Sequence, residues 1–400
     1  MKNRDTLYFD YQASTPVDPE VLEKMRPWHA ESFANPHSVD HILGWKAAQA
    51  VEESAATIAS FIGAGPDEII FTSGATEANN LALLGLARRA AGGKRRRILV
   101  SAIEHKSVLA ACRILQEQHG YQIEHLPVEQ QGFLRLEELQ KLADEDVLLI
   151  SVMAVNNEIG VIQPAEEIAA IARKCGAFFH CDAAQAPCAI DISSLAAHAD
   201  LISLSAHKMY GPKGIGTLIV RRDLHDQIEP LIYGGGQQDN LRSGTIPVPL
   251  CVGMAAAAEL LQQSTAERKR TTIRMLRDRF VQGLTDSGVE YAINGPPDHS
   301  RHSGNVNIRF AGFSAHDILG ALQPHLAAST GSACTTGTPE PSHVLRAIGL
   351  SEEEADSSIR FSLGRFTTSD DVDEAVTHIA GKLARLYEQP GNKLAKAARV

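Results

Sequence analysis

The chain has 400 residues, of which 44% are hydrophobic and 22% charged, and its formal net charge is -10 at pH 7. This length suits one large or two moderate domains, and the composition is that of an ordinary globular protein. The negative charge argues against nucleic acid or an anionic membrane surface as the main partner. The longest apolar run, VLLISVMAV, is far too short to span a bilayer, and no signal-peptide pattern opens the chain.

Short apolar segments alternate with amphipathic ones through the middle of the chain. Strands are predicted at 68–72, 97–101, 122–127, 147–155, 177–182, 200–205 and 216–222, with helical patterns over 75–90 and 164–175. From about Gly253 to about Gly288 the pattern is helical, and shorter strands follow at 305–310 and 358–363. Alternating strands and helices favour a mainly parallel sheet covered on both faces. We therefore predict an α/β fold, with a large domain over 15–262 and a smaller α+β domain formed by 1–14 and 263–400.

Polar and ionisable residues follow these strands, at the point where each one ends. They are, in chain order, residues 73–76, residues 104–106, residues 156–158, Asp182 with Gln185, and His207 with Lys208. Ligands of parallel α/β sheets bind at the carboxyl ends of the strands. We therefore expect these groups to meet at one edge of the sheet, and this convergence is the main functional clue.

The turn Ser73-Gly74-Ala75-Thr76 opens a helix directly after a strand. Backbone N–H groups at a helix N-terminus favour an anion such as phosphate, and the Thr76 hydroxyl adds a donor. Ser205 and His207 lie beside Lys208 and could serve the same phosphate. The alternative is that Gly and Thr simply cap the helix, as they do in many strand–helix turns.

Asp182 ends the apolar strand AFFHCD, where a buried carboxylate needs a partner. It could cap a helix or form a structural ion pair. It could also join His180 and Cys181 in a metal site, but no further ligands follow at suitable spacing, so we expect no metal. The third interpretation is a contact with the protonated pyridine nitrogen of pyridoxal phosphate, where a carboxylate keeps the ring an electron sink.

Lys208 follows the apolar strand DLISLS and precedes the glycine-rich stretch MYGPKGIG. A lysine at a strand end can form a Schiff base with an aldehyde cofactor, and the glycines let the backbone pass close to it. A solvated surface lysine is the alternative. The order of phosphate turn, Asp182 and Lys208 on successive elements of one sheet favours the cofactor interpretation.

The six cysteines are scattered without a CxxC pair, as expected of reduced thiols in a cytoplasmic protein. Cys334 lies in STGSACTTGTPEP, a small, polar, Gly- and Pro-rich stretch typical of an exposed loop. A cysteine in such a loop can ionise and react. Four of the other cysteines sit within or beside apolar segments, and Cys188 lies in QAPCAI.

Several stretches together resemble the cysteine desulfurases of the NifS/IscS type, which are class V, fold-type I pyridoxal-phosphate enzymes. They include FTSGATEANNLA, EHKSV, NNEIGVIQP, HCDAAQAP, SAHKMYGPKGIG, GGGQQDNLRSGTIPV and GSACTTGTPEPSHVLRAIGL. The resemblance runs over about nine tenths of the chain, from YFDYQASTPVDP to SSIRFSLGRFTT. It implies a large domain with a mainly parallel seven-stranded sheet and a smaller domain that carries the cysteine loop.

The resemblance also implies a role for each site residue. Lys208 would hold pyridoxal phosphate covalently, Cys334 would be the nucleophile, and His105 would stack on the ring and help with proton transfer. The phosphate would be bound by Ala75, Thr76, Ser205 and His207, and by Thr245 of a neighbouring subunit, which implies a homodimer. Asp182 would pair with the ring nitrogen and Gln185 with the ring oxygen. Asn157 would also contact the cofactor, and together with Arg360 it would bind the substrate carboxylate.

The implied reaction converts L-cysteine to L-alanine and leaves a persulfide on Cys334 for transfer to an acceptor protein. The acceptor could serve iron–sulfur cluster assembly, tRNA thiolation or DNA phosphorothioation, because the tail after GRFTT diverges from the family pattern. Selenocysteine lyase or another class V activity is the nearest alternative. A non-catalytic scaffold protein is disfavoured by the presence of Lys208, His105, Asp182 and Cys334 together.

Overall fold

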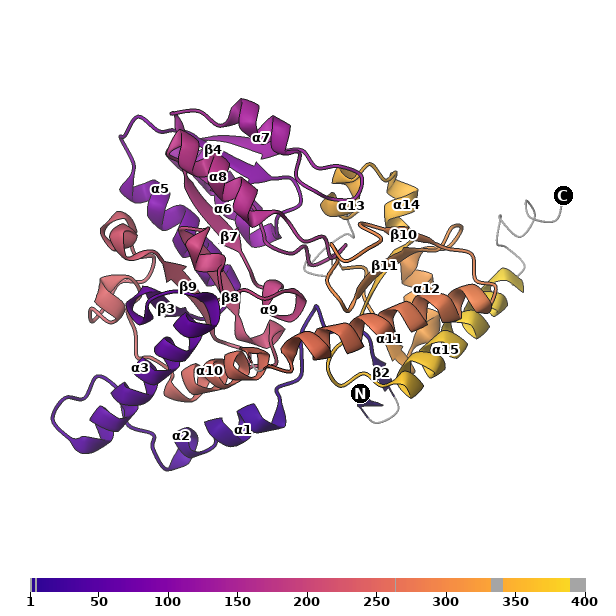
Figure 1. The fold of residues 1–400 in the computed structure, drawn as a ribbon, viewed down its shortest axis with the longest axis horizontal. Helices are drawn as coiled ribbons and strands as arrows, with labels where there is room; N and C mark the ends of the chain where they lie inside the picture. The colour runs from indigo at the N-terminus through magenta and orange to yellow at the C-terminus, as the bar shows by residue number, and fades with distance from the viewer. Residues whose placement is uncertain (1, 4–5, 263, 332–340, 389–400) are drawn as a thin grey trace.

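The largest sheet has seven strands in the order β3-β9-β8-β7-β6-β4-β5 (Figure 1). A computed structural model of the protein describes residues 2–3, 6–262, 264–331 and 341–388. The strands are β3 (Ile69–Thr72), β4 (Arg97–Ser101), β5 (Gln122–Leu126), β6 (Val147–Ser151), β7 (Phe178–Asp182), β8 (Leu201–Ser205) and β9 (Gly216–Val220). Each lies within a segment where the apolar pattern predicts a strand, and the predicted α/β class is confirmed.

Strand β9 runs antiparallel to both of its neighbours, β3 and β8, and the other pairs are parallel. Only residues 206–215 separate β8 from β9. That connection is too short for a crossover helix, so the strand has to return in the opposite direction. The carboxyl ends of β3, β4, β6, β7 and β8 therefore share one edge of the sheet, and the polar groups of the sequence follow these ends.

Helices cover both faces of this sheet (Figure 1). The helices of this larger part are α1 (Pro19–Met25), α2 (Pro27–Ala30), α3 (Ile42–Ile62), α4 (Ala75–Asn80), α5 (Leu86–Arg89), α6 (Lys106–His119), α7 (Leu136–Leu142), α8 (Ala165–Cys175), α9 (Ala186–Ala189) and α10 (Val248–Gln262). A π-helical segment, η2 (Leu81–Gly85), joins α4 to α5. Short 3-10 segments are η1 (Pro66–Glu68), η3 (Leu195–Ala197), η4 (Ala206–Lys208), η5 (Arg222–Gln227) and η6 (Gln238–Asn240).

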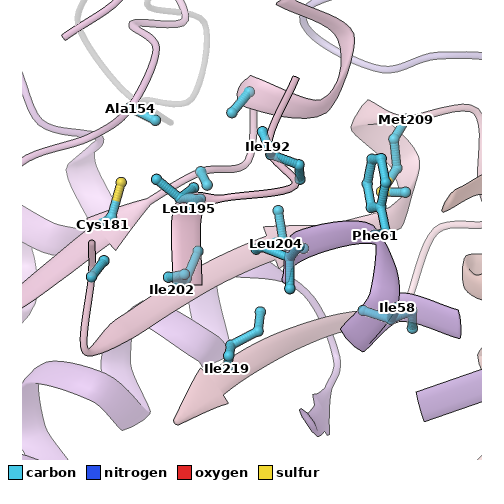
Figure 2. Packing of buried hydrophobic residues seen from close by; sticks show 14 of the residues in the cluster. Ile58, Phe61, Ala154, Cys181, Ile192, Leu195, Ile202, Leu204, Met209 and Ile219 are labelled. Atoms are coloured by element: carbon cyan, nitrogen blue, oxygen red, sulfur yellow. The ribbon is translucent and has the colours of Figure 1, made fainter. Parts of the chain in front are cut away.

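Two apolar cores lie on opposite faces of the sheet because successive strand residues point to opposite sides. Ile219 of β9 packs in the core that contains Ile58 and Phe61 of α3, as Figure 2 shows. Its chain neighbours Leu218 and Val220 belong to the other core, which the helical run from α4 to α5 covers. Apart from the edge strand β5, the strands are almost entirely buried on both faces, and they form a rigid platform for the residues at their ends.

A smaller α+β part lies beside this platform and contains the N-terminal strand β2 (Figure 1). Its strands are β1 (Lys2–Asn3), β2 (Thr6–Tyr8), β10 (Ala292–Asn294), β11 (Asn305–Arg309), β12 (Leu326–Ala327) and β13 (Ser358–Ser362). Its helices are α11 (Ala266–Asp286), α12 (Ala315–Leu322), α13 (His343–Ala347), α14 (Glu352–Asp356) and α15 (Ser369–Glu388). Leu7 and Phe9 pack with Phe280, Phe361 and their neighbours in one core. The domain boundaries after residues 14 and 262 stay predictions.

Among the helices in the described ranges, none is both long and apolar enough to cross a membrane.

Candidate active site

A cavity of about 480 Å³ opens at the carboxyl edge of the sheet, against the N-terminal segment and the smaller part of the fold. Ten of the predicted site residues line it: Ala75, Thr76, His105, Asn157, Asp182, Gln185, Ser205, His207, Lys208 and Arg360. Its size falls in the range of small-molecule and cofactor pockets. The convergence expected from the strand ends is therefore present in the fold.

The turn between β3 and α4 forms one end of the cavity. Gly74 has φ of 151°, a conformation that favours glycine. Strand β9 passes so close that a Cβ on Gly216 would lie 2.6 Å from the Cα of Gly74. The two glycines thus let the turn and the neighbouring strand pack closely. As a result, the start of the helical run from α4 to α5 faces the cavity, and the N–H groups there have no intrahelical partner.

Asp182, at the end of β7, is 4% exposed, and each carboxylate oxygen accepts one hydrogen bond. Asn79 Nδ2 donates to Oδ2 over 2.7 Å, and the Ala184 N–H donates to Oδ1 over 3.0 Å. Because a carboxylate oxygen has two lone pairs, each one retains capacity for a further donor. Asp182 can therefore accept a bond from a protonated ring nitrogen without losing its present partners.

Asn79 also connects Asp182 to His105, a link that the sequence did not reveal. Its Nδ2 donates to Ser107 Oγ over 2.9 Å, and that hydroxyl lies 2.8 Å from His105 Nδ1. The Ser107 N–H also donates to His105 Nδ1 over 3.2 Å, as expected for the N-cap of α6. Since Nδ1 accepts, the proton of a neutral His105 ring lies on Nε2. Burial lowers the pKa of His105, against the opposing charge of Asp182, and the nearby charge of Lys208 lowers it further.

Lys208 lies in η4, directly after β8, and its amine reaches back to the N-terminal segment. Its Nζ donates to the backbone oxygens of Gln12 over 2.5 Å and of Ala13 over 2.9 Å. Burial, and then the charges of Lys208 and Lys213, lower the pKa of His207 to about 4, so this ring is neutral at pH 7. These two backbone carbonyls hold the amine at the cavity wall.

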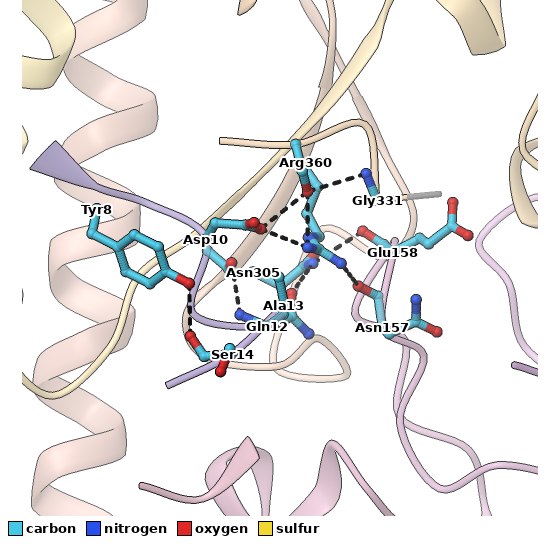
Figure 3. Close-up of polar contacts among 12 residues, drawn as sticks. Tyr8, Asp10, Gln12, Ala13, Ser14, Asn157, Glu158, Asn305, Gly331 and Arg360 are labelled. Atoms are coloured by element: carbon cyan, nitrogen blue, oxygen red, sulfur yellow. Dashed lines mark hydrogen bonds and ion pairs between the residues drawn. The ribbon is translucent and has the colours of Figure 1, made fainter. Parts of the chain in front are cut away.

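Arg360, on β13, brings a buried positive charge into the cavity from the smaller part of the fold (Figure 3). Its Nη2 donates to Asp10 Oδ1 over 2.6 Å and to Ser329 Oγ over 2.9 Å. Its Nη1 donates to the backbone oxygen of Asn157 over 2.7 Å. The Nε atom is buried and has no hydrogen-bond partner within the part of the chain that the structure describes. The guanidinium therefore keeps donor capacity for a carboxylate ligand.

Comparison with known proteins agrees with this geometry. The aminotransferase class-V family matches residues 7–375. Cysteine desulfurase IscS of Rickettsia felis is 48% identical over 382 residues, which cover 96% of this chain and 92% of that protein. The chain belongs to the cysteine desulfurase group of the class-V aminotransferases. Two solved structures are similar to this class-V fold. A NifS-like protein has a TM-score of 0.88 at 35% identity, covering 95% of this chain and 100% of its own. A second structure, SspA in complex with cysteine, has a TM-score of 0.79 at 39% identity, covering 91% and 100%.

The cavity lining does not test the predicted roles of two further residues of this desulfurase-type chain, Thr245 and Cys334. Thr245 is exposed, in the loop between η6 and α10, and it does not line the cavity of its own chain. Its predicted role requires a second subunit and stays a prediction. Cys334, predicted as the nucleophile, lies outside the described residues.

His180 and Glu104 lie buried behind the desulfurase-type site, and Glu104 Oε2 has no hydrogen-bond partner among the described residues. His180 is fully buried, and its ring nitrogens lie 2.8 Å from Ser151 Oγ and 3.2 Å from Ser203 Oγ. Burial lowers the pKa of His180 to about 4. Burial and the charge of Asp182 raise the pKa of Glu104 well above its usual value, and its Oε1 accepts the Met153 N–H over 2.6 Å. Across the described ranges, no three His, Cys, Asp or Glu residues are grouped to hold a metal ion.

Proposed function

We propose that this chain is a pyridoxal-phosphate-dependent cysteine desulfurase that takes sulfur from L-cysteine, releases L-alanine and passes the sulfur on as a protein persulfide. The observation that carries the proposal is the common cavity. It gathers an amine on Lys208, a buried carboxylate on Asp182, a phosphate-type turn and the Arg360 guanidinium. The family match and the name of the IscS relatives support the same activity.

The size of the cavity and the donor chemistry of its lining suit pyridoxal phosphate. The Gly74 turn offers a small-residue cradle with helix N–H groups for the phosphate, next to Ser205 and His207. Asp182 keeps lone pairs for the ring nitrogen, and Gln185 is positioned by its bond to the Gln12 oxygen over 2.9 Å. Lys208 would bind the group covalently. When bound, this cofactor withdraws electrons from the substrate's α-carbon and weakens the bonds there.

The protein's own residues then bind the substrate and move protons. Arg360 and Asn157 would bind the substrate carboxylate, so the α-carbon faces the Lys208 side of the cavity. The Lys208 amine, once released, would take the α-proton at Nζ. The neutral His105 ring, which carries its proton on Nε2, would serve as a proton donor near the ring of the cofactor.

The sulfur of the substrate would be transferred to the Cys334 thiol. The Cys334 thiolate attacks the sulfur of bound cysteine, a new S–S bond forms and the Cβ–S bond breaks. The electron pair of that bond stays with carbon, which gains protons and leaves as alanine. Cysteine plus the enzyme thiol thus become alanine plus an enzyme persulfide, without an external oxidant.

The proposed enzyme is a homodimer that passes its sulfur to an acceptor protein. Thr245 would reach the phosphate of a second copy of this chain, which makes the enzyme a homodimer with shared sites. The persulfide would pass to an acceptor protein for iron–sulfur cluster assembly, tRNA thiolation or DNA phosphorothioation. The reduced cysteines support a cytoplasmic location for this transfer.

The experiment supplies pyridoxal phosphate and L-cysteine to the purified protein and measures alanine and sulfide together. We expect equal amounts of both with a reducing thiol present, and, without it, an added sulfur atom on the peptide that contains Cys334. Borohydride reduction should attach the cofactor to Lys208. Failure to bind the cofactor, or alanine without any sulfur on Cys334, would refute the proposal.

A further inference from the structure

A carboxylate lines the part of the cavity that the proposed function assigns to a phosphate. Glu77 lies in the first turn of α4, and its Oε2 accepts the Ser73 N–H over 2.7 Å. Its side chain is only 14% exposed. Because like charges placed together at a poorly solvated site repel strongly, an uncompensated Glu77 would oppose a bound phosphate.

Arg242 compensates this charge through a two-point contact. Its Nε donates to Glu77 Oε1 over 2.8 Å and its Nη2 to Oε2 over 3.3 Å, and its side chain is 20% exposed. Burial raises the pKa of Glu77, but Arg242 and the Ser73 N–H outweigh burial and hold that pKa below its usual range. Glu77 therefore stays ionised, and the Arg242 guanidinium, rather than solvent, neutralises its charge.

The loop that carries Arg242 is itself fastened to the strand that leads into the turn. The Gln238 side chain accepts the Phe71 N–H over 2.6 Å and donates to the Phe71 oxygen over 3.0 Å. It also donates to the Arg242 oxygen over 3.2 Å. Gln238 and the next two residues have φ of 50°, 55° and 64°, an uncommon conformation for three consecutive non-glycine residues. Backbone strain of this kind persists only where the surroundings impose it.

We propose that Arg242 is a positioning residue for the cofactor phosphate. Arg242 neutralises the charge of Glu77, so the turn can accept a phosphate. Glu77 in turn holds the shape of the turn through its hydrogen bond with the Ser73 N–H. The inference rests on the proposed function, because it needs pyridoxal phosphate as the ligand. It adds that affinity for the phosphate depends on an arginine that does not itself line the cavity. Arg242 precedes Thr245 by three positions, so the same loop would carry the residue that reaches toward the partner subunit.

A double-mutant cycle on this pair separates charge compensation from a merely structural role. The variants are Arg242→Met, Glu77→Gln and the two combined, and the readouts are the Kd of pyridoxal phosphate for the apoprotein and the rate of cofactor loss to a scavenger. We expect Arg242→Met to weaken cofactor binding about tenfold or more, because it exposes the ligand to an unpaired carboxylate. Glu77→Gln, and the double variant, should stay within about threefold of the wild type. Unchanged affinity in Arg242→Met, or a double variant as weak as Arg242→Met, would overturn the inference.

Two controls identify the source of any failure. Arg279→Met removes an exposed arginine from a two-point ion pair with Asp373, 2.7 and 2.6 Å long, between α11 and α15, and should leave cofactor affinity unchanged. If wild-type protein does not bind pyridoxal phosphate, the proposed function fails rather than this inference. If Arg242→Met does not fold, Arg242→Lys and the double variant decide: both should bind within a few-fold of wild type, and a tenfold loss in the double variant would refute charge compensation.

Discussion

Replacing Asp10 by asparagine removes the negative charge beside Arg360 while it keeps an oxygen for hydrogen bonding. The Arg360 side chain is 4% exposed and that of Asp10 is 18% exposed, and their contact is 2.6 Å long. Removing one partner of a buried ion pair costs about 3–5 kcal/mol, and a retained hydrogen bond returns about 1 kcal/mol of it. We therefore expect Asp10→Asn to lower the free energy of unfolding by about 2–4 kcal/mol.

Urea unfolding of the apoprotein measures this loss, and Asp373→Asn is the matched control. Asp373 pairs with Arg279, and both side chains are 54% exposed, so the control should change stability by less than about 1 kcal/mol. A carboxylate ligand such as L-alanine should stabilise Asp10→Asn more than the wild type, because it restores a negative partner for Arg360. This role for the charge pair would be refuted if Asp10→Asn were as stable as the control variant, or if L-alanine did not raise its free energy of unfolding more than that of the wild type.

Four further outcomes test the site and the buried groups. Lys208→Ala should lose the covalent cofactor and turnover, and borohydride labelling at another lysine would contradict its role. Cys334→Ser should keep the bound cofactor but form no persulfide, and normal sulfide release by this variant would exclude Cys334 as the nucleophile. The folded-state pKa values of His180 and His302 lie near 4, below the value of about 6.5 in the unfolded chain. Between these two pH values the unfolded state therefore binds more protons than the folded state. Stability should fall as pH drops from 7 to 5, on the order of 2 kcal/mol for each histidine, and His180→Asn should flatten that slope in urea titrations. Burial raises the pKa of Cys188 to about 12, so a thiol reagent at pH 8 should leave Cys188 unmodified in the native protein, as peptide mapping can check.

The sheet and the polar groups at its strand ends could be predicted from local patterns. The strands of this sheet are apolar runs bounded by polar turns, and the period of such runs is a property of neighbouring residues. Parallel strands bring their carboxyl ends to one edge, so Asp182 and Lys208 could be placed together before any coordinates were known. The family motifs added further lining residues, including Arg360, whose strand β13 belongs to the smaller part, but not Asp10, Gln12 or Ser329.

The partners of these residues could not be read in the same way. Arg360 meets Asp10 across 350 positions of the chain, Arg242 meets Glu77 across 165, and Asn79 meets Asp182 across 103. No periodicity links such pairs, because each contact depends on how β13, the loop after η6 and α4 dock against the sheet. The amino-acid pattern therefore determined the elements and the chemical groups at their ends. The tertiary structure decided which charge each group faces, since a side chain's partners are set by packing between elements and not by its neighbours in the chain.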